Sequence, residues 1–388
     1  MMKLYYEDAY ATEFDAVVLS CEQVTYNNQK AYEVILNKTL FFPEEGGQSP
    51  DKGTINDIRV LDVQINKDVI THTLTQPIEV GSEVHGEIDW QHRFSNMQQH
   101  SGEHIFSGTV HREYGFNNVG FHLSDNGVTM DFDGVLTAEQ IQDIEWKVNE
   151  AIAKNIKVDV RFPSKEELST MEYRSKIEIE GDVRIVTIPG YDVCACCAPH
   201  VSRTGEIGML KVMGVQNYKG GVRIHMLCGF RALAAFRERL DIVSQLTNLL
   251  STSQENIVDR VTQLKDMVHE QKLLLGQIKQ DMMLAKIVQI PTEIKDVILF
   301  EDDLDTPIMR NVVNSLVDYH SGVCAVFVGD DVQGYRFILG SKVQDCNAVA
   351  VNLRDAFGAK CGGSKGMIQG SIFTAREKLE AFFEPYDE

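Results

Sequence analysis

The sequence contains no apolar run long enough for a membrane span, because no window approaches the roughly eighteen consecutive apolar residues that a transmembrane helix needs. Its opening segment, MMKLYYEDAY, has neither the basic flank nor the apolar centre of a secretion signal. We therefore expect a cytoplasmic protein with no membrane partner.

Basic residues are scarce as well: 37 Lys and Arg face 57 Asp and Glu, for a net charge of −20. Such a charge argues against a nucleic-acid partner, because phosphate groups are repelled. Residues 201–240 are an exception, with seven basic and two acidic residues and a local charge of +5. This segment is either a nucleic-acid contact or a solvated basic surface.

Disulfides are not expected, because a chain without a secretion signal stays in a reducing compartment. The eight cysteines are unevenly spread along the chain. Three of them, Cys194, Cys196 and Cys197, lie just before His200. This clustering indicates metal chemistry.

What the sequence does contain is the composition of a globular protein, 43% hydrophobic and 24% charged, with enough length for two or three domains. Residues 1–90 are short β-branched runs separated by turn residues, which predicts a small β-barrel-like N-terminal domain. Residues 91–240 contain helical patterns at 93–114 and 137–155 and then several strand-like runs. We expect an α+β domain there.

A heptad pattern marks residues 241–290 as a helical, coiled-coil-like linker. Thr252, followed by Glu255, is expected to cap the long helix as a capping box. The helix packs either on itself as a hairpin or on a second chain, and the second alternative predicts a homodimer. The apolar positions of the seam are Ile257, Val261, Leu264, Val268, Leu275, Ile278, Met282 and Ala285.

The last segment, residues 291–388, has the order strand, helix, strand, strand, helix, which predicts a small C-terminal α/β domain for tRNA binding or dimerisation. Its glycine-rich stretch 361–371 is either a loop that approaches a phosphate or a tight loop needed for packing. The fold class of the whole chain is predicted to be α+β.

Two histidines stand four residues apart in the first predicted helix. Residues at this spacing lie above one another on a helix, so His100 and His104 can both direct imidazole nitrogens at one metal ion. Cys196 and His200, three residues apart in a predicted loop, add a thiolate and a third imidazole. Such a set suits tetrahedral zinc.

Spacing alone leaves two questions about this predicted zinc site open. Cys194 and Cys197 compete with Cys196 for the thiolate position. Four protein ligands are typical of a structural zinc, whereas a catalytic zinc keeps a position for water or substrate.

Three further residues are candidates for catalysis or substrate recognition. Thr39 and Gln48 flank a Pro/Gly turn, for which a plain β-turn is the simpler explanation. A threonine hydroxyl in a small pocket can recognise a substrate hydroxyl and reject substrates that lack it. Glu103, beside His104, is either a partner of the metal ligands or a solvated helix carboxylate.

Three motifs in order, KTLFFPEEGGQSPDKG, IDWQHRFSNMQQHSGEH and CCAPHVSRTGEIGMLKV, together with the glycine-rich tail, resemble the alanyl-tRNA editing family. This family comprises the editing domain of alanyl-tRNA synthetase and the free-standing AlaX proteins. The resemblance spans nearly the whole chain and indicates the long AlaX form. It implies that His100, His104, Cys196 and His200 are zinc ligands, and it places Thr39 and Gln48 in the substrate pocket.

Two positions depart from the family pattern. The segment 197–199 reads Cys-Ala-Pro where Gly-Gly-Thr is usual, and Glu45 stands where a small residue is commoner. The sequence shows no aminoacylation motifs, so we expect a free-standing editing factor.

The resemblance implies zinc-dependent hydrolysis of serine, or of glycine, from wrongly charged alanine tRNA. One alternative is editing of serine on threonine tRNA. Others are a non-catalytic, zinc-stabilised tRNA-binding scaffold and a metallohydrolase that acts on a small molecule.

Overall fold

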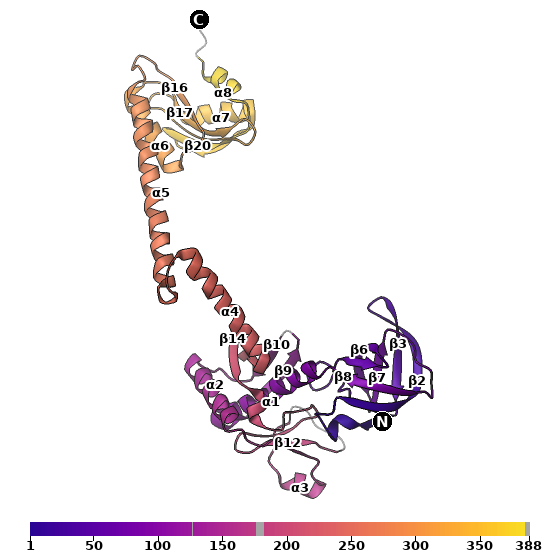
Figure 1. Cartoon of the computed structure of the whole chain (residues 1–388). Helices are drawn as coiled ribbons and strands as arrows, with labels where there is room; N and C mark the ends of the chain where they lie inside the picture. Colours follow the sequence, from indigo (N-terminus) through magenta and orange to yellow (C-terminus); the bar gives the residue numbers. More distant parts are fainter. Residues whose placement is uncertain (126, 176–181, 385–388) are drawn as a thin grey trace. The chain divides into compact units, whose positions relative to one another are not determined.

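The computed structural model describes residues 1–125, 127–175 and 182–384. The chain divides into two compact units, Met1–Val243 and Ser244–Glu388. Helices and strands occur in both units, which confirms the α+β class (Figure 1). No helix among the described residues is long and apolar enough to cross a bilayer.

The first unit begins with a closed β-barrel (Figure 1). Three of its tight turns, Asn27-Asn28, Asn56-Asp57 and Lys67-Asp68, have positive φ at both residues. Such turns match the twist of the strands that they join. The strands follow one another around the barrel as β2 (Glu13–Tyr26), β3 (Gln29–Leu36), β7 (Val69–Leu74), β6 (Ile58–Asn66), β5 (Gly53–Ile55) and β8 (Glu83–Ile88). A short parallel pair is formed by β1 (Met2–Lys3) and β4 (Lys38–Thr39). In the sequence, β1 precedes β2 and β4 follows β3.

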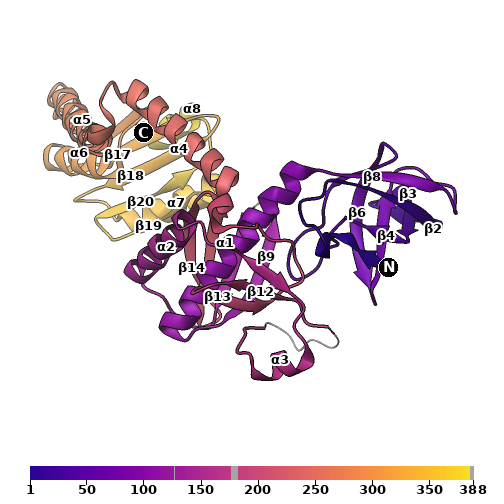
Figure 2. The same ribbon diagram turned by 60° about the horizontal axis from the view of Figure 1, so that its bottom comes forward.

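The helix that follows the barrel, α1 (Trp90–Tyr114), confirms the first predicted helix. Asp89 caps its start by accepting a hydrogen bond from the backbone N–H of His92, and Gly115 ends it with φ 72°. From Met97 to Val110 every residue of α1 is buried, because α2, β9, β13 and β15 enclose it. Figure 2 shows α1 between the barrel and these elements.

The remaining elements of the first unit include two helices and two sheets. The helix α2 (Ala138–Ala153) confirms the second predicted helix and begins with a capping box formed by Thr137 and Gln140. One sheet has the order β14 (Leu210–Tyr218), β15 (Gly221–Cys228), β10 (Gly127–Phe132), β9 (Asn118–Ser124). A second has the order β11 (Asp159–Arg161), β12 (Ile185–Ile188), β13 (Asp192–Ala195), and α3 (Lys165–Thr170) precedes β12.

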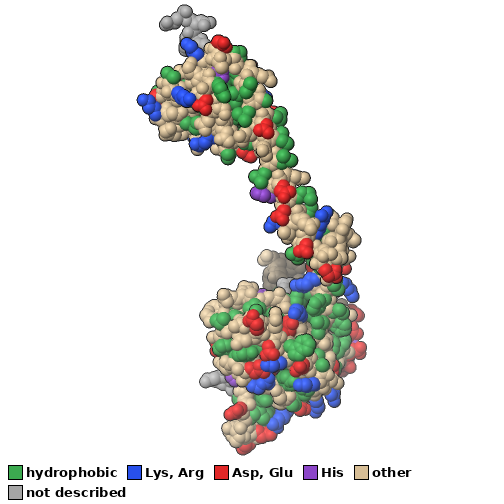
Figure 3. Space-filling model, turned by 90° about the vertical axis from the view of Figure 1, so that its left-hand side faces the viewer, with side chains coloured by type: hydrophobic (Ala, Val, Ile, Leu, Met, Phe, Trp, Pro, Cys, Tyr) green, Lys and Arg blue, Asp and Glu red, His purple; other side chains and the backbone are tan. Residues whose placement is uncertain are grey.

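The stretch predicted as a helical linker, residues 241–290, differs from the prediction where its long helix begins. Two helices are present, α4 (Gly229–Leu250) and α5 (Ile257–Val288), and the capping box at Thr252 is wrong. The N–H of Thr252 instead bonds to the carbonyl of Thr247 at the end of α4, and Asn256 is the N-cap of α5. Only Met283 and Ile287 of α5 are buried, so hydrophobic side chains stay exposed along this stretch (Figure 3).

The second unit is built around one mixed sheet. Its strand order is β16 (Val297–Glu301), β17 (Cys324–Asp330), β18 (Gly334–Gly340), β20 (Met367–Ile372), β19 (Lys360–Gly363), with β16 and β17 parallel. The helices α6 (Thr306–Tyr319) and α7 (Cys346–Phe357) confirm the predicted order of elements. A further helix, α8 (Arg376–Phe383), was not predicted.

The glycine-rich stretch forms a β-hairpin. Its strands β19 and β20 pair antiparallel, and β19 is the edge strand of the sheet. A Cβ on Gly370 would lie 2.3 Å from the carbonyl oxygen of Lys360. Glycine is required there by close packing of the backbone.

Candidate metal centre

Four side chains from two distant segments meet beside the barrel. α1 supplies His100 and His104, and the loop after β13 supplies Cys196 and His200. Their ligand atoms all lie within 4.8 Å of one another. The structure thus brings together the four residues that the sequence singled out as metal ligands.

Each of the three histidines is oriented by a hydrogen bond at Nδ1. These partners occupy the ring nitrogen on one side, so Nε2 is the atom available at the common centre. The Nδ1 atoms of His100, His104 and His200 lie 2.8 Å from Oε1 of Gln48, 2.9 Å from Oδ2 of Asp192 and 3.0 Å from Oγ of Ser101, respectively.

The spacing of these atoms fits zinc. Zn–S and Zn–N bonds of about 2.3 and 2.1 Å at a tetrahedral angle place sulfur and nitrogen about 3.6 Å apart. The Sγ of Cys196 lies 3.5 Å from Nε2 of His100 and 3.4 Å from Nε2 of His200. Three imidazoles and one thiolate are also a donor set that zinc favours.

The surroundings of Cys196 favour its thiolate form, which is the form that binds a metal ion. Burial alone would raise the pKa of Cys196, but His100 and His200 outweigh it and hold the pKa well below its usual range. Burial lowers the pKa of His200 to about 3, which leaves its imidazole neutral. For His104, burial opposes the charged form, but hydrogen bonds to Asp192 and Cys196 prevail and raise the pKa to about 9. A thiolate beside imidazoles is what a metal ion requires.

The two competing cysteines are in different surroundings. Burial raises the pKa of Cys194, whose Sγ lies 3.5 Å from the carbonyl oxygen of Ala195. Burial and the neighbouring Cys196 and Glu45 raise the pKa of Cys197. Both therefore remain thiols, whereas Cys196 is the thiolate of the cluster. Cys194 does form a second group of possible ligands with His104 and Asp192.

Glu103 is not solvated. Its side chain is buried, and Oε1 accepts hydrogen bonds from Ser107 Oγ and Asn118 Nδ2, both at 2.6 Å. Oε2 lies 3.9 Å from Nε2 of His104. The alternative of an exposed helix carboxylate is wrong, and Glu103 is fixed at the edge of the cluster.

Gln48 reaches the cluster because of the turn that precedes it. Glu45 and Gln48 are joined by two backbone hydrogen bonds across Gly46 and Gly47, whose φ values are 62° and 82°. A Cβ on Gly47 would lie 2.3 Å from the carbonyl oxygen of Phe121. The second glycine therefore lets the turn approach β9 closely enough for Gln48 to bind His100.

Thr39 lies in the barrel core, away from the hydrogen bonds of the cluster. Nδ1 of His72 faces the carbonyl oxygen of Val34 at 3.1 Å and must donate to it, so Nε2 of His72 is an acceptor. The Thr39 hydroxyl, 2.9 Å from that Nε2, donates to it and also accepts from the N–H of Phe41. It keeps one lone pair with which to accept a further hydrogen bond.

Sequence reasoning missed the residues that orient the ligands. Ser101 and Asp192 stand next to His100 and four residues before Cys196, respectively, which is a weak signal. Arg174, which bonds both oxygens of Asp192 at 2.7 and 2.8 Å, has no signal in the sequence at all.

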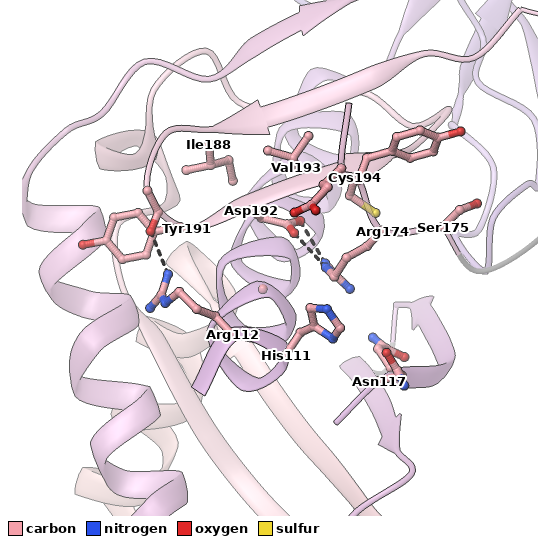
Figure 4. Close-up of a pocket in the computed structure, with 15 residues that line it drawn as sticks. His111, Arg112, Asn117, Arg174, Ser175, Ile188, Tyr191, Asp192, Val193 and Cys194 are labelled. Carbon is pink, nitrogen blue, oxygen red and sulfur yellow. Dashed lines mark hydrogen bonds and ion pairs between the residues drawn. The ribbon is translucent and has the colours of Figure 1, made fainter. Parts of the chain in front are cut away.

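A cavity of about 770 Å³ is lined in part by Asp192 and Arg174 (Figure 4). Asp192 lines it and also binds His104. Arg174 also lines it and donates to Asp192, and Arg112, another lining residue, donates to the carbonyl oxygen of Gly190.

Comparison with known proteins gives two family matches. Residues 183–225 match the family "Threonyl and Alanyl tRNA synthetase second additional domain", and residues 2–92 match "tRNA synthetases class II (A)". The chain is 28% identical to the alanyl-tRNA editing protein Aarsd1 of Rattus norvegicus, over 100% of this chain and 98% of that protein. The chain belongs to the alanyl-tRNA editing protein family.

Other relatives agree with membership in the alanyl-tRNA editing protein family. Alanyl-tRNA editing protein Aarsd1-B of Xenopus laevis is 31% identical over 67% of this chain and 66% of its own length. An alanine–tRNA ligase of Ignicoccus hospitalis is 31% identical over 72% of this chain but only 31% of its own length. The likeness to the ligase is therefore confined to part of that larger protein.

Proposed function

We propose that this chain is an editing hydrolase that removes serine, or glycine, from wrongly charged alanine tRNA with the help of zinc. The observation that carries the proposal is the convergence of three imidazole Nε2 atoms and one thiolate within 4.8 Å, in a member of the alanyl-tRNA editing protein family. A buried thiolate surrounded by three imidazoles is a donor set suited to a metal ion.

The chain's own residues would hold the metal ion and fix the orientation of its ligands. Zinc, when bound, supplies positive charge that polarises the aminoacyl group. His100, His104, Cys196 and His200 would hold it. Gln48, Asp192 and Ser101 keep the three rings in the orientation that the ion needs.

Thr39 is proposed to distinguish serine from alanine. Its proton is committed to His72, so it would recognise a serine hydroxyl by accepting a hydrogen bond from it. Alanyl-tRNA lacks that hydroxyl and would be spared.

The test is a comparison of deacylation rates. Alanine tRNA charged with serine, with glycine and with alanine is incubated with the wild-type protein and with the His104→Ala variant. We expect rapid loss of serine, slow loss of alanine and no activity in the variant. Equal rates for serine and alanine, or full activity of the variant, would refute the proposal.

Threonine tRNA charged with serine belongs in the same assay, because the matched family covers both threonyl and alanyl synthetase domains. Faster loss of serine from threonine tRNA than from alanine tRNA would favour the alternative substrate.

A tRNA-binding scaffold is a second candidate, because four protein ligands are typical of a structural zinc. Chelation separates the two. The two hydrophobic cores of the first unit contain many buried apolar residues that do not depend on an ion. We therefore expect a chelator to abolish turnover while the far-ultraviolet circular dichroism is kept, whereas unfolding on chelation would support the scaffold.

The proposed partner is tRNA, and the proposed assembly is a cytoplasmic homodimer formed through the exposed apolar residues of α5. Affinity for tRNA is expected to fall steeply with salt. Light scattering of the full chain measures the oligomeric state directly.

A further inference from the structure

The turn that carries Gln48 also places a carboxylate next to the metal ligands. Glu45 and Gln48 face each other across the two glycines, and the side chain of Gln48 contacts His100. A Cβ built on Gly46, the residue after Glu45, would lie 3.3 Å from Sγ of Cys197, and Cys197 directly follows the ligand Cys196. Glu45 thus borders the metal centre from the barrel side.

Polar atoms without a partner gather at this border. Oε2 of Glu45, Nε2 of Gln48 and the hydroxyl of Tyr5 are buried and have no hydrogen-bond partner among the described residues. The side chains of Tyr5 and Gln48 are each only 1% exposed. Buried polar groups that no protein atom satisfies need another partner, such as a water, an ion or a ligand.

No basic side chain neutralises Glu45 within the described part of the chain. It forms no ion pair there. Arg184, which lies near Cys197, donates through Nη1 to the carbonyl oxygens of Cys196 and Ala198, both at 2.8 Å, and its buried Nε has no hydrogen-bond partner among the described residues. A carboxylate oxygen that is buried and unpaired is costly unless a cation approaches it. The missing partner is therefore a small cationic donor.

We infer that Glu45 binds the α-ammonium group of the aminoacyl ester, with the Tyr5 hydroxyl as a second acceptor and Nε2 of Gln48 donating to the ester carbonyl. The inference rests on the proposed function. A free α-ammonium group is common to all aminoacyl esters and absent from N-blocked ones, so this site selects aminoacyl-tRNA over peptidyl-tRNA. Amino-acid identity is read elsewhere.

The test uses binding rather than turnover. The probes are 3′-deoxy-3′-(seryl)amidoadenosine, which is not an ester, and its neutral analogue with a hydroxyl in place of the ammonium group. Isothermal titration measures both affinities for the wild-type protein, for Glu45→Gln and for Glu44→Gln. Glu44 is a matched control because its exposed carboxylate accepts from Gln64 Nε2, away from the cluster.

We expect the wild type and Glu44→Gln to prefer the ammonium probe by about tenfold to a hundredfold, as for a hydrogen bond to a charged group. In Glu45→Gln the two affinities should become nearly equal. An unchanged preference in Glu45→Gln, or no preference in the wild type, overturns the inference. The wild-type comparison needs no variant to fold, and deacylation of seryl-tRNA by the wild type tests the proposed function independently.

Discussion

Asp192 Oδ2 lies 2.9 Å from Nδ1 of His104, and Arg174 donates hydrogen bonds to both oxygens of the same carboxylate. Asp192 thereby fixes the tautomer and the ring orientation of one candidate zinc ligand. Its pKa is held below the usual range: burial would raise it, but His104 and Arg174 prevail. The carboxylate is therefore charged and cannot donate to the imidazole.

The Asp192→Asn variant is expected to bind zinc about tenfold to a hundredfold more weakly, because the amide is a poorer acceptor and can present its NH₂ group instead. Competition with a chromogenic chelator measures the affinity. Asp143→Asn, on the exposed surface of α2 beside Lys147, is the control and should leave it unchanged. Equal affinities in the two variants would contradict the role of Asp192.

Gly47→Ala is expected to weaken zinc binding and to destabilise the first unit, because its Cβ would lie 2.3 Å from the carbonyl oxygen of Phe121 and force Gln48 away from His100. Gly81→Ala is the matched control: its φ of 86° is similar, but a Cβ there meets nothing within 4 Å. Thermal unfolding and chelator competition should both separate the variants. If both lose the same stability, the close approach to β9 is unimportant.

Arg93 and Asp51 form an ion pair that is fully buried between α1 and the barrel. Arg93 also donates to the carbonyl oxygens of Ala9 at 3.0 Å and Leu40 at 2.6 Å. Arg93→Met leaves an uncompensated buried carboxylate and is expected to cost about 3–5 kcal/mol of unfolding free energy. Urea denaturation measures this, with the exposed Arg59→Met as control, and a loss below 1 kcal/mol would show that the pair behaves like a surface one.

His72 makes the stability of the barrel depend on pH. Burial lowers its pKa from 6.5 to about 4, so between these values the unfolded chain binds more protons than the folded one. His72 therefore makes unfolding free energy rise with pH from about 4 to 6.5 and lowers stability as pH falls through this window. In His72→Gln the slope over this window should be smaller, whereas Thr71→Val on the same strand should keep it. Chemical denaturation at several pH values gives both slopes, and identical slopes would refute the prediction.

Local sequence determined the ends of helix α1 and the placement of its two histidines. Helix α1 begins after Asp89 and ends before Gly115, because the capping carboxylate and the left-handed glycine each act within one turn of the helix end. His100 and His104 share a face for the same local reason, since helical geometry aligns residues four apart. The predicted capping box at Thr252 was wrong because the helical backbone is interrupted at Ser251, which has φ 48°. The helix α5 starts only at Ile257, and Asn256 is its N-cap.

The chain alone thus determined which side chains can bind a metal ion, through periodic spacing on one helix and in one loop. Only the tertiary structure decided which cysteine is the thiolate and which groups orient the rings. Gln48, Ser101, Asp192 and Arg174 reach the cluster from separate segments, and their distances depend on how the barrel, α1 and β13 pack. The pKa of Cys196 likewise depends on burial and on histidines that are remote in sequence, and short-range pattern carries no information about either.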